Sequence, residues 1–228
     1  ETLDLSKFKY KRKSDSLPMS FGTGFEQIDF EETNIRRFIT KISEPNFHGC
    51  IKFSSQQILA RGYLMMMGGR CIGAEYSCAS ETFAKSTEGS IACILDNLAV
   101  EDAVVQKFNL SREIVYTLSS PFLAKHSWDM SNEEPDFVKR VIEDFRHGTT
   151  KTGMIQLRTQ QGFAWAVFFS GRFIGFFNVE TQTFRNNIEV FDKYLESPNE
   201  LLAQIYVLPL FWKVTDDDAG IDLIKFLD

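Results

Sequence analysis

Residues 49–76 read GCIKFSSQQILARGYLMMMGGRCIGAEY, and residues 153–177 read GMIQLRTQQGFAWAVFFSGRFIGFF. With one two-residue gap placed in the region of residues 64–68, the two stretches share the opening Gly, an Ile, Gln-Gln, an Ala, then Gly-Arg, Ile and Gly. Such similarity within one chain indicates an internal duplication, because repeated structural units leave repeated sequence. A chain of 228 residues has room for two small domains, so we expect two related units.

Each copy is predicted to form an antiparallel meander of three strands. In both copies, short apolar runs alternate with turn residues, and the third run follows a dipeptide that contains Gly. Gly68-Gly69 and Ser170-Gly171 are these dipeptides, and Gly supplies the positive φ that a tight hairpin requires. The strands are expected at residues 50–53, 58–67 and 70–76 of the first copy, and at residues 153–157, 162–169 and 172–179 of the second.

Helices are predicted on both sides of each meander. Residues 31–43 and 135–147 carry apolar side chains at the spacing of an amphipathic helix. Further helices are expected at residues 91–98, 101–108 and 187–195, and closing strands at residues 113–122 and within residues 200–212. The predicted fold class is therefore α+β, with two related units that each combine a helix and an antiparallel β-meander with a further helix and a closing strand.

The predicted elements divide the chain into five segments. These are a basic arm or linker (residues 1–24), a first repeat unit (25–123), a polar junction (124–134), a second repeat unit (135–214) and an acidic cap with a helix (215–228). We interpret the arm as a solvated tail or edge strand, and contact with an acidic partner or a membrane surface is the alternative. The run Asp216-Asp217-Asp218 is interpreted as a helix cap rather than as a cation site.

Composition excludes several classes of function. A net charge of -6 and a pI near 5.2 argue against binding to nucleic acid, which requires clustered Lys and Arg. The four cysteines form no CxxC pair, which favours reduced thiols and a cytoplasmic location. The longest apolar runs, such as residues 163–169, are much shorter than the roughly twenty residues that a membrane span needs. We therefore expect a cytoplasmic protein without a membrane span.

The sequence offers no catalytic constellation. Its histidines are His48, His126 and His147, and the first and last precede the two meanders, where turn or packing roles are expected. The motifs GxSxG, HExxH, GxxxxGK[ST] and GxGxxG are absent from the sequence. We predict that the protein is not an enzyme and that it has no catalytic residue, no metal ligand and no cofactor.

Six residues are candidates for contact with a ligand or a partner. Arg70 and Arg172 each follow a hairpin glycine, where an arginine pair could hold a carboxylate or phosphate or could instead orient its own turn. The other candidates lie on the aromatic and methionine-rich strands, which indicate burial against the other copy or against a partner protein. They are Tyr63 and Met66 in the first copy and Trp165 and Phe168 in the second.

The helix and meander of each copy resemble the bacterial PATAN domain, a family named for the N-terminal region of a cyanobacterial response-regulator protein. The residues that carry this resemblance are Phe47, Gly49, Ile51, Tyr63, Gly69, Arg70, Ile72 and Ala74 in the first copy, and Gly153, Ile155, Trp165, Phe168, Phe169, Gly171, Arg172 and Ile174 in the second. The resemblance covers about half of the chain. It implies a non-catalytic module of bacterial signalling proteins that binds other proteins.

Two functions are therefore kept open. The first is an interaction or adaptor module in bacterial signal transduction, whose partner is another signalling protein or a second copy of the chain. The alternative is a sensor that binds a small anionic ligand, such as a nucleotide second messenger, between the two units, with Arg70 and Arg172 as clamps. Convergence of the two arginines on a pocket would favour the sensor, and arginines bonded to turn carbonyls would count against it.

Overall fold

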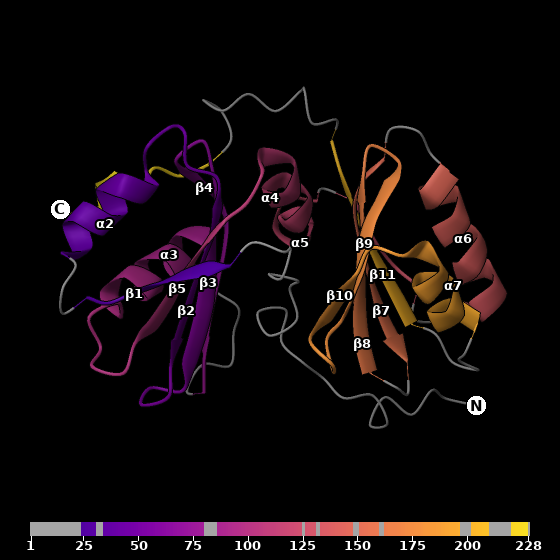
Figure 1. Ribbon diagram of the computed structural model, residues 1–228, viewed down its shortest axis with the longest axis horizontal. Helices are drawn as coiled ribbons and strands as arrows, with labels where there is room; N and C mark the ends of the chain where they lie inside the picture. Colours follow the sequence, from indigo (N-terminus) through magenta and orange to yellow (C-terminus); the bar gives the residue numbers. More distant parts are fainter. Residues whose placement is uncertain are drawn as a thin grey trace. The chain divides into compact units, whose positions relative to one another are not determined.

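The computed structural model describes residues 24–30, 34–79, 86–124, 126–130, 133–147, 151–159, 162–196, 202–209 and 220–227. The chain divides into two compact units (Figure 1). The first unit comprises the described residues of Phe21–Leu123 together with those of Val214–Asp228, and the second comprises those of Ala124–Lys213. Each unit contains an antiparallel sheet and helices, which confirms the predicted α+β class.

The first unit contains β1 (Phe25–Ile28), α2 (Ile35–Ile42), β2 (Gly49–Ser55), β3 (Ala60–Met67), β4 (Arg70–Cys78), α3 (Thr87–Asp96), β5 (Val104–Asn109), α4 (Arg112–Leu118), α5 (Ser120–Leu123) and the 3-10 helix η3 (Ile224–Phe226). Its sheet has the order β1-β5-β2-β3-β4. Helices α2 and α3 cover one face of this sheet, and α4 and α5 cover the other (Figure 1).

The second unit contains β6 (His126–Asp129), α6 (Pro135–His147), β7 (Thr152–Thr159), β8 (Gly162–Phe169), β9 (Arg172–Asn178), β10 (Thr183–Arg185), α7 (Ile188–Glu196) and β11 (Leu202–Leu208). Its sheet has the order β10-β9-β8-β7-β11-β6. Helices α6 and α7 pack against one face of the sheet (Figure 1). Both meanders and both of these helices lie where the sequence pattern placed them, to within a few residues at their ends.

Five strands of each sheet have the same order, and the second sheet has one more strand, β10, at the outer edge of β9. In each unit the last strand lies between the first and the second, and the third and fourth strands follow outward. In each unit one helix connects the first strand to the second, and another helix precedes the last strand. Each ladder between the third and fourth strands also shifts register at one place, between Met65 and Met66 in the first unit and between Val167 and Phe168 in the second. Positions in the two sheets can therefore be matched by their pairing partners.

This matching corrects the place of the two-residue gap between the copies. Gly49 pairs with Met66 and Gly153 pairs with Phe168, so β3 and β8 correspond without a gap as far as the hairpin. Residues 56–59 connect β2 to β3, whereas only residues 160–161 connect β7 to β8. The gap expected at residues 64–68 therefore lies in the turn between the first two strands of the meander, because turns accept insertions that a paired strand does not.

Steric contact with the neighbouring strand explains why each copy opens with a glycine. A Cβ on Gly49 would lie 2.0 Å from the carbonyl oxygen of Phe108, and a Cβ on Gly153 would lie 1.9 Å from that of Tyr206. Both distances are far below any real carbon–oxygen contact. The neighbouring strand thus approaches closely in both sheets, and only glycine fits at this position.

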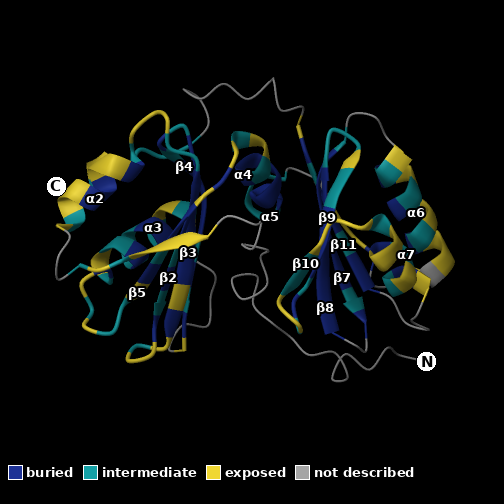
Figure 2. Cartoon of the chain, in the orientation of Figure 1, coloured by how far each residue is buried: buried dark blue, intermediate teal, exposed yellow. Residues whose placement is uncertain are grey.

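Each unit has its own hydrophobic core between the sheet and its pair of helices (Figure 2). In the first unit, Phe38, Ile39 and Ile42 of α2 pack on the inner face of the sheet. In the second unit, Val138, Ile142 and Phe145 of α6 belong to the core. Figure 2 shows the strands mostly buried, while the outer faces of these helices are exposed. The amphipathic spacing therefore predicted most of the two buried faces, although Phe137, expected on the apolar face of the second helix, is 41 % exposed.

Three predicted elements are wrong. The helix expected at residues 101–108 is strand β5, and the strand expected at residues 113–122 is helices α4 and α5. Ser111 caps α4, because its side chain accepts a hydrogen bond from the backbone N–H of Ile114. The junction at residues 124–134, expected to be irregular, contains edge strand β6. The arm at residues 1–23 and the carboxylates of residues 216–218 lie outside the described residues.

Candidate functional site

Four of the candidate contact residues are buried. Met66 faces the core beneath α2 and α3, and Tyr63 faces the opposite side of the same sheet, where its ring lies 6.4 Å from that of Phe122. Phe168 belongs to the core beneath α6 and α7, and Trp165 is 0 % exposed on the opposite face. These side chains shape the two sheets and do not form an open binding surface.

The two candidate arginines have different environments. Arg70 donates from Nε and Nη2 to the carbonyl oxygen of Gly220, at 3.2 and 2.9 Å, and so holds the C-terminal segment, residues 220–227, against β4. Arg172 is exposed, and no described residue forms a hydrogen bond or ion pair with its guanidinium. The arginines belong to different units. Arg70 thus binds neither its own turn nor a free cavity.

The histidines that precede the meanders also differ. His48 accepts a hydrogen bond at Nδ1 from the backbone N–H of Gly68, 3.0 Å away, and therefore holds the hairpin turn. In the second unit the same bond is made by Thr152 Oγ1, which accepts from the N–H of Ser170. His147 lies at the exposed end of α6, where its Nε2 is 3.1 Å from Glu143 Oε2. The turn role expected for His48 is confirmed, and its counterpart is Thr152, not His147.

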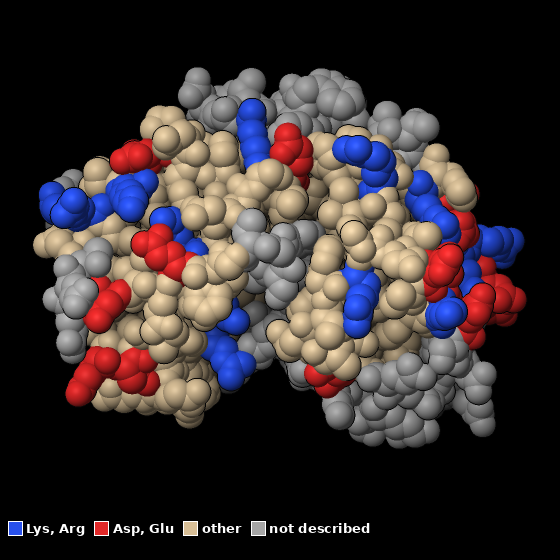
Figure 3. All heavy atoms as spheres, in the orientation of Figure 1, with Lys and Arg blue, Asp and Glu red and all other residues tan. Residues whose placement is uncertain are grey.

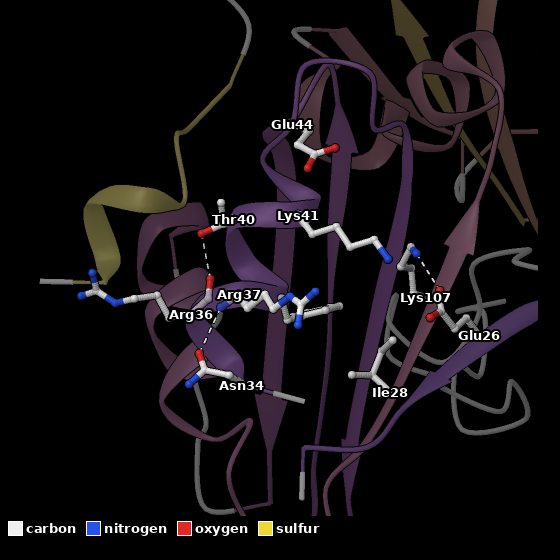
Figure 4. A pocket seen from close by; sticks show the side chains of 10 residues that line it. Glu26, Ile28, Asn34, Arg36, Arg37, Thr40, Lys41, Glu44 and Lys107 are labelled. Carbon is white, nitrogen blue, oxygen red and sulfur yellow. Dashed lines mark hydrogen bonds and ion pairs between the residues drawn. The ribbon is translucent and has the colours of Figure 1, made fainter. Parts of the chain in front are cut away.

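A groove of about 790 Å³ lies between α2 and the edge of the first sheet (Figure 4). Its floor is formed by β1 and β5, and its wall by α2. The volume is within the range of about 300 to 1,000 Å³ that small-molecule sites occupy. The lining residues are Glu26, Ile28, Asn34, Arg36, Arg37, Phe38, Thr40, Lys41, Glu44 and Lys107.

Helical spacing determines which α2 side chains face the groove. Asn34 caps the helix by accepting a hydrogen bond from the N–H of Arg37 at 3.1 Å. Arg37 and Lys41 are one turn apart, and Figure 4 shows both extending toward the floor of the sheet. Arg36 extends to the other side of the helix, where its Nη2 donates to the carbonyl oxygen of Leu227 at 2.7 Å. The groove therefore receives two cations from α2.

An ion pair between a buried lysine and an exposed glutamate lies on the floor of the groove. Lys107 of β5 is 7 % exposed, and its Nζ donates to Oε2 of Glu26, its cross-strand neighbour, at 2.6 Å. This hydrogen bond, together with the charges of Lys107 and Lys41, holds the pKa of the Glu26 carboxyl below its usual value against the opposing effect of burial. Lys107 Nζ also lies 5.9 Å from the centre of the Phe47 ring.

The matching position in the second sheet is apolar. Lys107 pairs with Ile51 and Glu26, whereas its counterpart Ile205 pairs with Ile155 and Trp128. Ile205 is 0 % exposed and belongs to the core of the second unit. The same position in the same strand order therefore accepts an aliphatic side chain. The Glu26 side chain is 52 % exposed, and ion pairs that water can reach contribute little to stability, so folding alone does not explain the charged pair in the first unit.

Charge is distributed differently over α6 and α7 of the second unit. On the face drawn in Figure 3, acidic and basic side chains are interspersed there. Arg146 Nη1 of α6 lies 3.0 Å from Asp192 of α7 and 3.2 Å from Glu143 of α6, so this positive charge is paired with carboxylates of both helices. By contrast, Arg37 and Lys41 are exposed beside the groove, and neither forms a hydrogen bond from its side chain or an ion pair with a described residue. The groove therefore has a local excess of positive charge in a chain that is acidic overall.

Sequence reasoning did not find this groove. Lys107 was assigned to a helix, and Glu26 and Arg37 are far from it in the sequence. The available signal was Lys107 itself, because it is the charged residue of the stretch VVQKFN and a lysine is rarely buried unless its charge is paired. Among the described residues, no group of three or more His, Cys, Asp or Glu side chains could hold a metal ion.

Comparison of the chain with protein-family models, with curated proteins and with solved structures finds no match. None of the described helices is long and apolar enough to cross a membrane.

Proposed function

We propose that the chain is a non-catalytic binding module that recognises an anionic group of another protein in the groove between α2 and β1. The observation that carries this proposal is the Lys107–Glu26 pair, which maintains charge at a position where the second sheet has an aliphatic side chain. Arg37 and Lys41 add two exposed cations beside it. A site built in this way attracts an acidic segment and orients it through charge-assisted hydrogen bonds.

The role of an adaptor in signalling is consistent with this groove. Adaptors need a specific contact surface and no reacting group, and an acidic or phosphorylated segment is a common signal in such contacts. The resemblance of the helix and meander to a bacterial signalling module supports the same proposal. We expect the affinity of the groove for an acidic segment to fall as the salt concentration rises, because the attraction acts between partly exposed charges.

A small anionic ligand is the second candidate. The groove has the volume for a nucleotide-sized molecule, and its two exposed cations could hold a phosphate. This candidate differs from the sensor predicted from the sequence, because Arg70 already binds Gly220 and lines no part of the groove. The ligand would contact the first unit alone.

Binding of defined anionic probes distinguishes these functions. Labelled peptides rich in glutamate or phosphoserine are titrated into the protein, and inorganic phosphate and mixed nucleotides are titrated separately. We expect an acidic peptide to bind the wild type, and Arg37→Ala/Lys41→Ala to weaken it by about tenfold or more, since each lost bond to a charged group contributes about 1.5 to 3 kcal/mol. The matched control is Lys139→Ala/Arg140→Ala on α6, which is expected to bind like the wild type.

Each outcome of this titration decides between the candidates. Binding of a nucleotide or phosphate that is lost in the α2 variant, without peptide binding, would favour the sensor. Binding that the α2 and α6 variants weaken equally would show a general charge effect and contradict both. Failure of every probe to bind would reject the groove as an anion site. Folding of each variant is checked by its thermal unfolding, and little change is expected because Arg37 and Lys41 are exposed.

A further inference from the structure

The C-terminal segment forms an isolated antiparallel β-bridge with the outer edge of β4. Cys71 N–H donates to the carbonyl oxygen of Ile221 at 2.9 Å, and Ile221 N–H donates to that of Cys71 at 2.8 Å. Arg70 binds the preceding carbonyl, that of Gly220, with two donors. Leu223 then enters the core and is 0 % exposed. The first unit thus shows in detail how its fourth strand binds an extended peptide.

The fourth strand of the second sheet has the same features at the same place. The hairpin before it contains Gly171 in the left-handed conformation and is followed by Arg172, as Gly69 is followed by Arg70. Phe173 pairs with Phe168 just after the register shift, as Cys71 pairs with Met66. The outer backbone groups of Phe173 therefore correspond to those that Cys71 uses to bind the C-terminal segment.

This part of β9 has no pairing strand on its outer side among the described residues. Strand β10 pairs with residues 176–178 of β9 and does not reach residues 172–174. The side chains along the two edges are buried to different extents, as expected if one edge is covered and the other is not. Ile72 is 5 % exposed beside the C-terminal segment, whereas Ile174 is half-buried and Arg172 is exposed. The second unit therefore presents an arginine and an unpaired edge where the first unit binds a peptide.

We propose that the edge of β9 at residues 172–174 binds an extended segment of a partner protein by strand addition. The segment has the chemistry of residues 220–223: Arg172 binds a backbone carbonyl, the next residue exchanges two backbone hydrogen bonds with Phe173, and an apolar residue follows. Strand addition of this kind takes its affinity from main-chain hydrogen bonds, and the side chains on either side of the edge select the sequence. The protein's own C-terminal segment is engaged on β4, so residues 220–223 of the same chain are not the segment proposed for β9.

One difference limits how deeply the partner enters. Phe173 is larger than Cys71, and its ring packs on Phe191 at 5.5 Å between centres and on Phe168 at 5.5 Å. This aromatic cluster fills core space at the edge of the second unit, where the first unit has Cys71 and the side chain of Leu223. The bound segment is therefore held by its backbone and by Arg172, with its apolar residue resting on the surface around Ile174.

The probe is a labelled synthetic peptide with the sequence AGIDLIKFL, blocked at both ends and titrated into the full chain. We expect saturable binding with one peptide per chain. Arg172→Ala is expected to weaken binding by about tenfold or more, because a charged donor to a carbonyl is lost. Arg185→Ala, an exposed arginine of β10 in the same sheet, is the matched control and is expected to leave the affinity unchanged.

A second peptide tests the backbone bonds directly. Methylation of the backbone nitrogen at the first Ile removes the donor that the pairing requires and leaves every side chain in place, so binding is expected to be lost. Equal binding of the methylated peptide, equal weakening by both arginine variants, or no binding at about 1 mM peptide would each overturn the proposal. Displacement of the protein's own segment, detected as faster hydrogen exchange at the Ile221 amide of the protein, would also overturn it, because the peptide would then occupy β4.

Discussion

Replacement of Leu223 by Ala tests whether the C-terminal segment is part of the first unit. The Leu223 side chain is 0 % exposed and contacts the core of the first unit. The described residues that come before the segment in the sequence, residues 202–209, belong to the second unit. Leu→Ala at a fully buried site costs about 2 to 5 kcal/mol, from lost apolar transfer and from the cavity that remains. Because the segment is short and can detach, we expect a value near the lower end, about 2 to 3 kcal/mol.

The assay is chemical denaturation together with hydrogen exchange of the Cys71 and Ile221 amides. Each of these two amides donates a hydrogen bond to the carbonyl oxygen of the other residue, so their rates of exchange with solvent report docking of the segment directly. Ile224→Ala is the matched control, because this neighbouring side chain is 39 % exposed and its loss should change stability by less than about 0.5 kcal/mol. Equal stability of the Leu223→Ala and Ile224→Ala proteins, with unchanged exchange at Cys71, would refute the reasoning.

Three further predictions concern stability and reactivity. The hydroxyl of Ser55, and then the backbone N–H groups of the following turn, hold the pKa of Asp102 below its usual value. Asp102→Asn should therefore unfold at a lower temperature than the wild type at pH 7, and the difference should shrink as pH falls below about 4 and the wild-type carboxylate becomes protonated. Gly49→Ala should prevent stable folding, measured by circular dichroism, because the new Cβ collides with a backbone carbonyl. A thiol reagent should modify Cys93 first in the folded protein and spare Cys71, since burial raises the pKa of the Cys71 thiol to about 12.

The meanders could be predicted because each carries several local signals that agree. Apolar strands, a glycine hairpin and a preceding amphipathic helix all indicate the same arrangement in both copies. Strand β5 could not be assigned in this way, because Val104, Val105 and Phe108 fit a helical spacing as well as a buried strand. Its identity as a strand depends on pairing with β1 and β2, which lie far away in the sequence. Tertiary pairing decides such ambiguous segments.

The candidate site was less predictable than the fold. The sequence pattern predicts that Arg70 orients its own turn or holds an anionic ligand, whereas its partner is the carbonyl oxygen of Gly220, which is 150 residues away and carries no side chain to signal the contact. The groove is formed by α2, β1 and β5, whose charged residues have no fixed spacing in the sequence. The ion pair of Lys107 and Glu26 becomes visible only when the strand register places them opposite each other.

In the hairpin sequence Gly-Arg, the glycine is required by the turn, whereas the arginine is explained by the group that it binds. Gly69 needs the left-handed conformation, with φ of 73°, and a Cβ there would lie 2.3 Å from the carbonyl oxygen of Ser43. These constraints explain the glycine and leave the arginine unexplained, because a hairpin of this type places no demand on the residue that follows it. Arg70 is explained by the carbonyl of Gly220 that it binds. Arg172 occupies the same position, and no described strand pairs with the edge at residues 172–174, so the argument that explains Arg70 extends to Arg172 only if a peptide carbonyl reaches it, which is what the proposed strand addition supplies.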